Sequence, residues 1–211
     1  MLAGGSGSRM GFTEKPLLRI CGKRIVDRIA SISQNLGLPM MIVCNERNYG
    51  IYREVARELK AKTGVNVRVA VDVISGFGPI AGIYTALLEC DSGSVVAVGG
   101  DMPFVRKDVV SFLFSRGEEI GCDALIPERN GRKEPLLAYY STTSLPAFER
   151  AIKKGMRRII SAVEFMRKAV FLSVDELRKV DEELISFFNV NSPEDLKRAE
   201  EICSSTGLEG E

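Results

Sequence analysis

The amino-acid sequence predicts an α/β protein: a three-layer α/β/α sandwich with a mostly parallel central sheet. Short apolar runs alternate with amphipathic stretches along the chain, the pattern of strands joined by crossover helices. Of the 211 residues, 45% are hydrophobic, enough to bury a sizeable core. No repeat, low-complexity segment or linker divides the chain, so we expect a single domain over residues 1–211.

In the first half of the chain, helices and strands are expected to alternate. Apolar residues from Ile25 to Leu36 recur at the spacing of one helix face, which predicts a helix over 24–36. The elements expected after it are a buried strand at Met40–Cys44, a charged surface helix over 48–62, a strand at Val67–Val71, a helix over 80–90 and a strand at Ser94–Val98.

The second half continues the same alternation. The expected elements are a helix over 106–116, strands at 124–126 and 135–140, helices over 143–154 and near 159–166, a strand at 169–172 and a short helix over 175–179. A final helix begins at Ser192, whose side chain suits the N-cap position. Pro193 then fills the first helical position, and Glu194 and Asp195 place acidic groups in the first turn.

The most informative stretch lies at residues 2–15, which combines several glycines with an arginine and a lysine. Glycine permits positive φ angles and leaves backbone N–H groups uncovered, so such a loop can wrap a polyphosphate. Arg9 and Lys15 supply the positive charge that phosphate oxygens require. A flexible Gly/Ser leader is the alternative, but the apolar run at 16–20 follows at once and favours a folded segment. The glycines are Gly4, Gly5, Gly7 and Gly11.

This stretch matches neither common nucleotide-binding motif. A P-loop requires Lys and then Ser or Thr directly after its second glycine, whereas Lys15 lies four residues past Gly11 and precedes a proline. The dinucleotide fingerprint requires a third glycine where this chain has Met10. Both standard motifs are therefore excluded.

The composition excludes several classes of function. The formal net charge is +1, which does not suggest a nucleic-acid-binding face, and no apolar stretch is long enough to span a membrane. The chain has no histidine, so Ser-His and Cys-His nucleophiles and His-based acid/base schemes are excluded. The chemistry must then use carboxylates, lysine, arginine, backbone amides and a hard metal ion.

The cysteines are scattered along the chain without C-x-x-C spacing. This distribution predicts neither a disulfide nor a zinc site. It also favours a reducing cytoplasm as the location of the protein. The five residues are Cys21, Cys44, Cys90, Cys122 and Cys203.

Polar or glycine residues directly follow four of the expected strands. Leu2-Ala3 leads into the glycines, Cys44 into Asn45, Val71 into Asp72, and Val98 into Gly99-Gly100-Asp101. Because ligands of parallel α/β sheets collect beyond the carboxyl ends of the strands, we expect these residues to form one site. Turn chemistry alone explains any one of them, since Asn, Asp and Gly favour turns. A carboxylate such as Asp101 at the end of a buried strand can hold Mg²⁺.

The stretch at 2–11 with Lys15 downstream resembles nucleotidyltransferases that activate sugars and cofactors on a Rossmann-like sandwich. Four further segments are similar to the molybdenum cofactor guanylyltransferase family, in the same order across nearly the whole chain. They are Gly-Pro-Ile-Ala-Gly at 78–82, Gly-Asp-Met-Pro-Phe at 100–104, Glu-Pro-Leu-Leu-Ala at 134–138 and Phe-Asn-Val-Asn-Ser-Pro-Glu-Asp-Leu at 188–196. Arg157 and Arg158 after Gly155 resemble another segment of that family. The resemblance implies the GT-A type fold of the nucleotide-diphospho-sugar transferases.

The resemblance also implies an activity, namely transfer of GMP from GTP to the phosphate of Mo-molybdopterin, with pyrophosphate as the second product. Mg²⁺ is the implied cofactor, and molybdoenzymes or cofactor-delivery proteins are implied partners, whereas nucleic acid and membranes are not. The attacking phosphate has a second pKa of about 6, so it is already ionised at neutral pH and needs no general base. Catalysis then consists of positioning and charge neutralisation of an in-line displacement.

The family's functional residues are carried over to the matching positions of this chain. Lys15 would neutralise the α-phosphate, Arg9 would hold the departing pyrophosphate, and Asp101 would bind Mg²⁺. Asn45 and Asp72 would face base and ribose or serve only as turn residues, and Asn191 would bind the acceptor or cap the last helix. The implied nucleotide-binding residues are Leu2, Ala3, Gly4, Gly5, Gly7, Lys15, Asn45, Asp72, Gly82 and Asp101. The implied acceptor-binding residues are Arg157, Arg158, Asn189 and Asn191.

Other possibilities stay open. Glu14 stands where the family usually has Asp, and the segment 14–17 with Cys21-Gly22 is closer to adenosylcobinamide-phosphate guanylyltransferases. A nucleotide-binding regulatory module would keep the fold without the chemistry. Only Met1 precedes Leu2, so we expect either that the true start codon lies upstream or that the first central strand is truncated.

Overall fold

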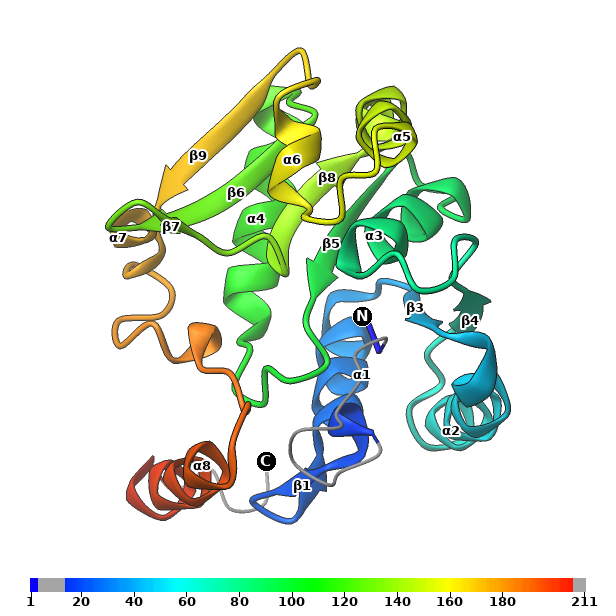
Figure 1. Cartoon of the computed structure of the whole chain (residues 1–211). Coiled ribbons are helices and arrows are strands. Elements are labelled where there is room, and N and C mark those ends of the chain that lie inside the picture. The colour runs from blue at the N-terminus through cyan, green and yellow to red at the C-terminus, as the bar shows by residue number, and fades with distance from the viewer. Residues whose placement is uncertain (4–13, 207–211) are drawn as a thin grey trace.

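The computed structural model describes residues 1–3 and 14–206 of the chain, and Figure 1 shows the arrangement of its elements. The helices are α1 (Ile25–Leu36), α2 (Tyr49–Thr63), α3 (Pro79–Leu88), α4 (Lys107–Ile120), α5 (Leu145–Lys153), α6 (Ile160–Val163), α7 (Val174–Leu177) and α8 (Pro193–Thr206). The strands are β1 (Arg19–Ile20), β2 (Lys23–Arg24), β3 (Met40–Cys44), β4 (Val67–Val71), β5 (Ser94–Val98), β6 (Ala124–Arg129), β7 (Arg132–Lys133), β8 (Leu137–Ser141) and β9 (Ala169–Ser173).

The central sheet is mixed and mostly parallel, as the alternation of elements predicts. β4 pairs with β3 in parallel, from Met40 opposite Val67 to Cys44 opposite Val71. On the other side, β5 pairs with β8, β8 with β6, and β6 with β9. β8 runs antiparallel to both of its neighbours, whereas β9 is parallel to β6. Leu2 joins the two halves, because it forms parallel bridges to Val43 and to Gly99.

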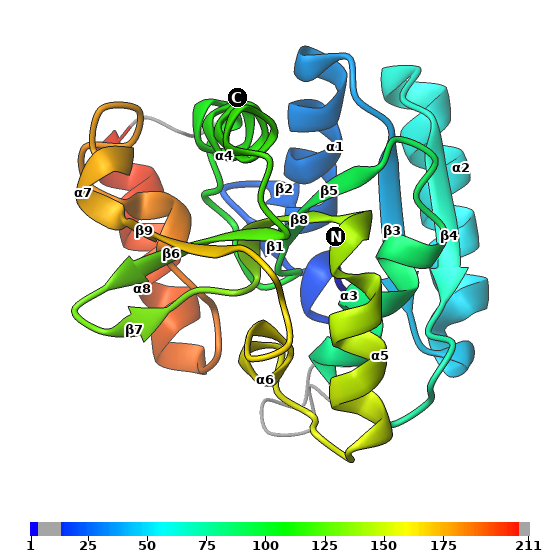
Figure 2. The ribbon, with the colours of Figure 1, turned by 90° about the horizontal axis from the view of Figure 1, so that it is seen from above.

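Helices cover both faces of this sheet, which gives the expected three layers (Figure 2). α1, α2 and α4 lie on one face, and α3, α5 and α6 lie on the other. Successive strand residues point to opposite faces and so build two separate cores. In β8, Tyr139 belongs to the core under α4, while Tyr140 belongs to the core under α5, where its ring meets Phe148 edge-on.

Leu2 lies between β3 and β5 and takes part in the sheet through its isolated bridges. The Leu2 N–H donates to Val98 O (3.0 Å), its carbonyl accepts from Gly100 N (3.0 Å), and Ala3 N donates to Val43 O (2.8 Å). The Met1 ammonium donates to Met41 O at 2.7 Å, and burial lowers its pKa to about 5. Behind Met1, a cavity of about 250 Å³ lies between β3 and β5. Apolar side chains such as Ile32, Leu36, Val96 and Phe114 line it.

The element boundaries differ from the expected ones mainly in α4. The sequence predicts an end near residue 116, but α4 continues to Ile120. Gly117 is part of the helix because a Cβ there would lie 2.4 Å from the ring of Tyr139, so glycine permits close packing of helix on strand. The helix ends instead at Gly121, whose φ of +61° forms the left-handed cap. The N-cap of α8 is confirmed, since Ser192 Oγ accepts from Asp195 N at 3.1 Å.

The expectation of no disulfide is wrong. Cys21 and Cys203 form a disulfide across a sequence separation of 182 residues, while Cys44, Cys90 and Cys122 are free. Linear spacing carries no signal for such a pair, because the fold alone brings the β1–β2 turn beside α8. The disulfide removes the ground on which a reducing cytoplasm was expected. None of the helices in residues 1–3 and 14–206 has the length and apolar content that crossing a membrane requires.

Candidate functional site

The strand ends meet at one edge of the sheet, as expected. The register of β3 and β4 places Cys44 opposite Val71, so Asn45 and Asp72 follow at the same level, and Asp72 N donates to Cys44 O at 2.8 Å. Leu2 lies between this pair of strands and the end of β5, which leads into Asp101. The carboxyl edge therefore presents residues from four separate segments side by side.

The centre of the site is the ammonium group of Lys15. It donates to Asp101 Oδ2 at 3.2 Å and to Asn191 Oδ1 at 2.7 Å. The Lys15 and Asp101 side chains are each 22% exposed, so the pair is accessible to a ligand. Three segments far apart in sequence thus bring a cation, a carboxylate and an amide oxygen to one point. Sequence reasoning selected all three of these residues.

Glycines let the Lys15 and Asp101 segments approach closely. A Cβ at Gly100 would lie 2.5 Å from Pro16 Cγ and 2.8 Å from Leu2 O, so no side chain fits there. Pro16 directly follows Lys15, and the contact therefore sets the distance between Lys15 and the end of β5. Asp101 is also fixed from the other side, because its carbonyl accepts from Val190 N at 2.8 Å.

Glu14, which directly precedes Lys15, is held by two side-chain hydrogen bonds. In the sequence it stood out only as a departure from the family. Its Oε2 accepts from the Tyr52 hydroxyl at 2.5 Å, and its Oε1 accepts from Asn48 Nδ2. Burial raises the pKa of Glu14, while these two hydrogen bonds oppose the increase. Tyr52 is fully buried in α2. The start of the Lys15 segment is therefore tied to the core on the α2 side.

Asn45 and Asp72 lie at the expected edge but also serve the local fold. Asn45 Oδ1 accepts from Asn48 N at 3.0 Å and caps the short turn that precedes α2. Asp72 Oδ1 accepts from the buried Thr85 hydroxyl at 3.1 Å, and burial raises the pKa of Asp72. Gly82 lies within α3, where a Cβ would be 3.0 Å from Leu2 Cδ2. Its small size thus gives room to the Leu2 side chain.

Glu134 is a site residue that sequence reasoning missed. Burial, and to a smaller extent the negative charge of Asp101, raise the pKa of Glu134. Its Oε1 accepts from Leu136 N at 3.3 Å. The sequence did contain a signal for Glu134, because this residue begins the segment 134–138 that resembles the family. That resemblance alone did not indicate what the Glu134 side chain does.

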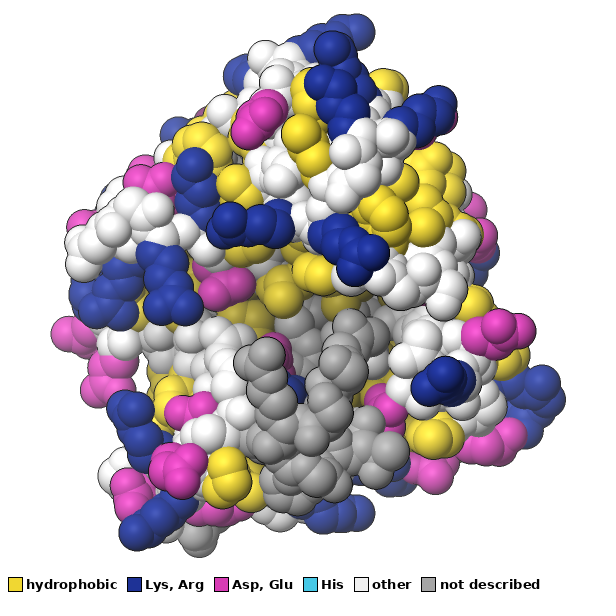
Figure 3. Space-filling view, viewed as in Figure 1, with side chains coloured by type: hydrophobic (Ala, Val, Ile, Leu, Met, Phe, Trp, Pro, Cys, Tyr) yellow, Lys and Arg dark blue, Asp and Glu magenta, His cyan; other side chains and the backbone are white. Residues whose placement is uncertain are grey.

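The residues expected to bind an acceptor are not all together. Asn191 contacts Lys15, whereas Asn189 Nδ2 donates to Phe187 O at 3.1 Å. Arg157 lies elsewhere, in the connection between α5 and α6, with its guanidinium 5.5 Å from the ring centre of Phe77. Arg158 beside it is exposed. On the face seen in Figure 3, lysine and arginine side chains gather over the upper part of the molecule.

The glycine-rich stretch and the metal site were both predicted from the sequence. Gly4, Gly5, Gly7 and Arg9 lie outside the described residues. For metal binding, residues 1–3 and 14–206 contain no cluster of three or more Asp, Glu, Cys or His side chains. The Asp101 carboxylate and the Asn191 amide oxygen beside Lys15 are the oxygen donors closest to the centre of this site.

The fold and the site together define an α/β nucleotidyltransferase. The chain belongs to the MobA-like NTP transferase domain family, because residues 1–168 match the sequence profile of that family. A crystal structure of molybdopterin-guanine dinucleotide biosynthesis protein A from Archaeoglobus fulgidus superposes with a TM-score of 0.79 and 40% sequence identity, covering 97% of each chain. The predicted sandwich and the predicted family are both confirmed.

Curated relatives agree with this assignment over almost the whole chain. A Methanosarcina mazei protein named "Probable molybdenum cofactor guanylyltransferase" is 35% identical, over 93% of this chain and 87% of its own length. A Desulfosudis oleivorans protein named molybdenum cofactor guanylyltransferase is 30% identical, over 95% of this chain and 92% of its own length. The similarity extends beyond the family match at residue 168 and includes the segment that carries Asn191.

Proposed function

We propose that this protein transfers GMP from GTP to the phosphate of Mo-molybdopterin, forming molybdopterin guanine dinucleotide and pyrophosphate. The observation that carries the proposal is the Lys15 ammonium between Asp101 and Asn191 at the carboxyl edge of the sheet. A lysine ammonium at this position suits nucleotidyl transfer, because negative charge builds on the α-phosphate. The names of the relatives support guanylyl transfer and molybdopterin as acceptor. Residues 1–211 would act as a single domain.

The residues around Lys15 fit Mg²⁺ as the cofactor. Asp101 Oδ2 and Asn191 Oδ1 converge on one positive charge, since both lie within 3.2 Å of the same ammonium nitrogen. Carboxylate and amide oxygens are hard ligands of the kind that Mg²⁺ accepts, together with phosphate oxygens of the substrate. When bound, Mg²⁺ would neutralise charge on the α- and β-phosphates. Asp101 would be its principal protein ligand, with Asn191 and Asn189 supporting.

GTP would lie along the edge formed by the first four strand ends. Leu2 and Ala3, with Gly4, Gly5 and Gly7, would face the guanine and the phosphates, and Asn45 and Asp72 would face the base and ribose. Arg9 would hold the departing pyrophosphate. Gly82 acts indirectly, by giving room to Leu2. Arg157 and Arg158 would attract the anionic acceptor from the α5–α6 side.

The absence of histidine from the chain agrees with this reaction. The attacking phosphate of molybdopterin is largely ionised at neutral pH, because its second pKa is about 6, so no side chain must remove a proton. Lys15 would leave Asp101 and Asn191 for the α-phosphate as charge develops there. The chain's own residues therefore contribute alignment and charge, which are the main sources of rate in such displacements.

The test is a transfer assay with purified protein, Mg²⁺ and molybdopterin that carries its terminal phosphate. GTP, CTP and ATP are supplied separately, and pyrophosphate release and product mass are measured. We expect turnover with GTP and much less with the other two nucleotides. Absence of a guanylylated product under all these conditions would overturn the proposal.

The same assay separates the alternatives. Adenosylcobinamide phosphate in place of molybdopterin tests the other guanylyltransferase activity, which the segment around Glu14 resembles. A regulatory module would bind GTP without releasing pyrophosphate with either acceptor. Under that alternative an Asp101→Ala variant would keep the biological function of the protein, whereas the transferase would lose it.

A further inference from the structure

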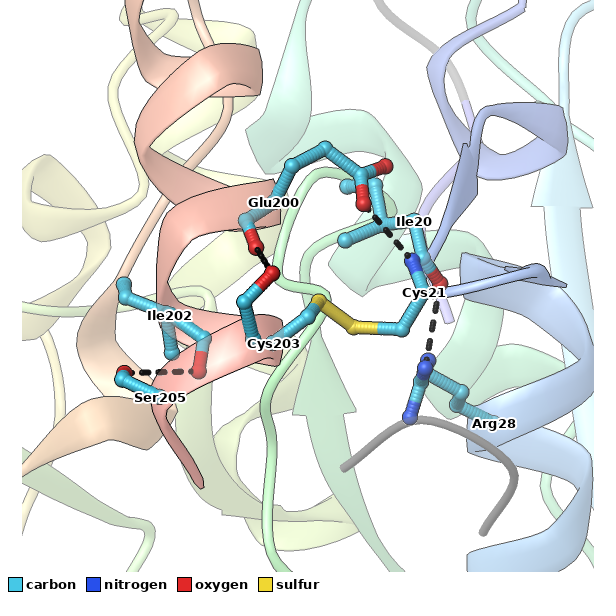
Figure 4. Close-up of a disulfide and its surroundings, with 8 residues drawn as sticks. Ile20, Cys21, Arg28, Glu200, Ile202, Cys203 and Ser205 are labelled. Carbon is cyan, nitrogen blue, oxygen red and sulfur yellow. Dashed lines mark hydrogen bonds between the residues drawn. A yellow bond between two sulfur atoms is a disulfide. The ribbon is translucent and has the colours of Figure 1, made fainter. Parts of the chain in front are cut away.

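The β1–β2 turn and α8 are linked covalently behind the site (Figure 4). Cys21 lies in the turn with a φ of +49°, and Cys203 lies on the inner side of α8. The two residues are 9% and 1% exposed, so the disulfide is buried. Arg28 of α1 donates to Ile20 O at 3.0 Å, which fixes the turn to the sandwich. The disulfide therefore attaches α8 to a well-anchored element.

The same two segments also make the polar contact at the site. The chain from Lys15 reaches Cys21 within a few residues, and Asn191 lies just before the first turn of α8. Asp195 Oδ2 accepts from both Asn191 N and Ser192 N at 2.9 Å, which ties Asn191 to that first turn. Any rotation of α8 about its attachment thus carries Asn191 with it.

α8 lies at the edge of the molecule, next to β1, rather than on either face of the sheet (Figure 1). Its carboxyl-terminal half is held to the turn by the disulfide and by Glu200 Oε2, which accepts from Cys21 N at 3.4 Å. The second of these contacts is long for a hydrogen bond and weak on its own. The covalent link therefore adds to the apolar packing of Ala199 and Ile202 in holding that half of the helix.

We propose that the Cys21–Cys203 disulfide is a positioning pair for the catalytic cluster. By fixing α8 against the β1–β2 turn, it keeps Asn191 Oδ1 within hydrogen-bonding distance of Lys15. Without it, α8 samples a wider range of orientations, and Asn191 is in place for a smaller fraction of the time. The effect on turnover rests on the proposed transferase function, whereas the effect on the position of residues 189–192 does not.

A dithiol reductant can open the link by thiol–disulfide exchange. One thiolate of the reductant attacks a cysteine sulfur, which breaks the S–S bond, releases the other cysteine as a thiolate and forms a mixed disulfide. The second thiolate of the reductant then attacks its own sulfur in the mixed disulfide and releases the remaining cysteine thiolate. The reductant is oxidised to a disulfide, and Cys21 and Cys203 each gain a proton as thiols. Because both sulfurs are buried, reduction is expected to be slow in the native protein. Substitution is the cleaner way to remove the link.

The first experiment measures amide hydrogen exchange in the double variant Cys21→Ser/Cys203→Ser, with Cys90→Ser as the matched control. Cys90 is free and partly exposed, and it lies outside the site. We expect exchange at residues 189–192 to be about tenfold faster in the double variant and unchanged in the control, with β5 and β8 unchanged in both. The wild-type protein, reduced by a dithiol in dilute denaturant and returned to buffer, serves as a second form if the variant folds poorly.

The second experiment measures turnover of the same proteins with GTP and acceptor. We expect kcat to fall about fivefold in the double variant while KM for GTP stays within about twofold, since Asn191 acts on Lys15 rather than on nucleotide affinity. A purely stabilising disulfide would leave kcat unchanged below the unfolding temperature. Equal exchange at 189–192 with and without the link overturns the proposal, whatever the acceptor assay shows. Absence of transfer in every form, with faster exchange in the variant, contradicts only the proposed function.

Discussion

Residues 14–24 and 189–206 meet in two places that differ in kind. At the carboxyl edge of the sheet, Lys15 contacts Asn191 through a partly exposed hydrogen bond and shares its charge with Asp101. Behind that edge, Cys21 and Cys203 are joined by a buried covalent bond. The first contact can be exchanged for contacts with a ligand, while the second cannot. The comparison suggests separate roles for the two contacts. The polar contact around Lys15 (the polar tie) can change when substrate binds, and the disulfide (the covalent tie) fixes the position of the segments that carry it.

The energies support this division. A partly exposed ion pair such as Lys15–Asp101 contributes about 0–1 kcal/mol, so a phosphate group can take Lys15 from its partners at little cost. A disulfide that closes a long loop stabilises by about 2–5 kcal/mol, chiefly through the unfolded state in the chain-entropy description. The site therefore combines weak polar contacts around Lys15 with a disulfide that contributes more to stability.

The largest expected effect on the rate of transfer comes from replacing Asp101, the carboxylate partner of Lys15. Asp101→Asn keeps the size of the side chain but removes its charge, and we expect transfer to fall about 10³-fold because the Mg²⁺ that we propose would lose its principal protein ligand. Asp91→Asn is the matched control, since Asp91 is exposed and pairs only with Arg68 among the contacts described. Pyrophosphate release at saturating GTP measures both. Transfer by Asp101→Asn at the level of Asp91→Asn would contradict the assigned role.

Loss of the Lys15 charge is expected to have the next largest effect. Lys15→Gln should lower kcat about 10²-fold, because the α-phosphate loses its mobile counter-charge. Lys23→Gln, a change of the same chemistry in β2, should leave kcat unchanged. Steady-state kinetics at several GTP concentrations distinguish the outcomes. If Lys15→Gln raises only KM, Lys15 binds GTP and has no specific role in the transition state.

How far the sequence predicts the molecule differs between these two ties. The residues of the polar contact could be selected from the sequence: Asp101 follows a buried strand, and strand ends gather at one edge by a general rule. Lys15 follows the glycine-rich stretch, and Asn191 was selected only through the family resemblance. The contact between Lys15 and Asn191 itself was not predicted. The covalent tie was not predictable. Cys21 and Cys203 have no local signature, and their proximity depends on the path of α8 across the edge of the molecule.

The fold shows the same contrast between local and long-range information. Periodicity located α1, β3, β4 and β5 correctly, because burial on one or both faces leaves a clear pattern. It missed the two-residue strands β1, β2 and β7, which are too short to show any period. It also ended α4 too early, since the use of Gly117 as a packing residue depends on Tyr139 more than twenty residues later.

Removing the covalent tie should lower stability more than it lowers turnover. For Cys21→Ser/Cys203→Ser we expect the free energy of unfolding to decrease by about 2–5 kcal/mol, measured by urea denaturation without reductant. Cys90→Ser should change it by no more than about 0.5 kcal/mol. Alkylation of the unfolded, unreduced wild-type protein should label only Cys44, Cys90 and Cys122. Labelling of all five cysteines would show that the tie is absent in the purified protein.

The smallest change in free energy among these predictions is expected at Asn191, which contacts Lys15. Asn191→Ala removes the amide oxygen that lies 2.7 Å from Lys15 Nζ, and we expect kcat to fall about tenfold, as for one well-placed hydrogen bond to a charged group. Asn35→Ala is the matched control, because Asn35 is exposed in the last turn of α1 and has no role in the proposed site. If Asn191 acts through Lys15, combining Asn191→Ala with Lys15→Gln should lower kcat little further than Lys15→Gln alone. Full additivity of the two changes would instead show that Asn191 acts independently, as a ligand of the metal or the acceptor.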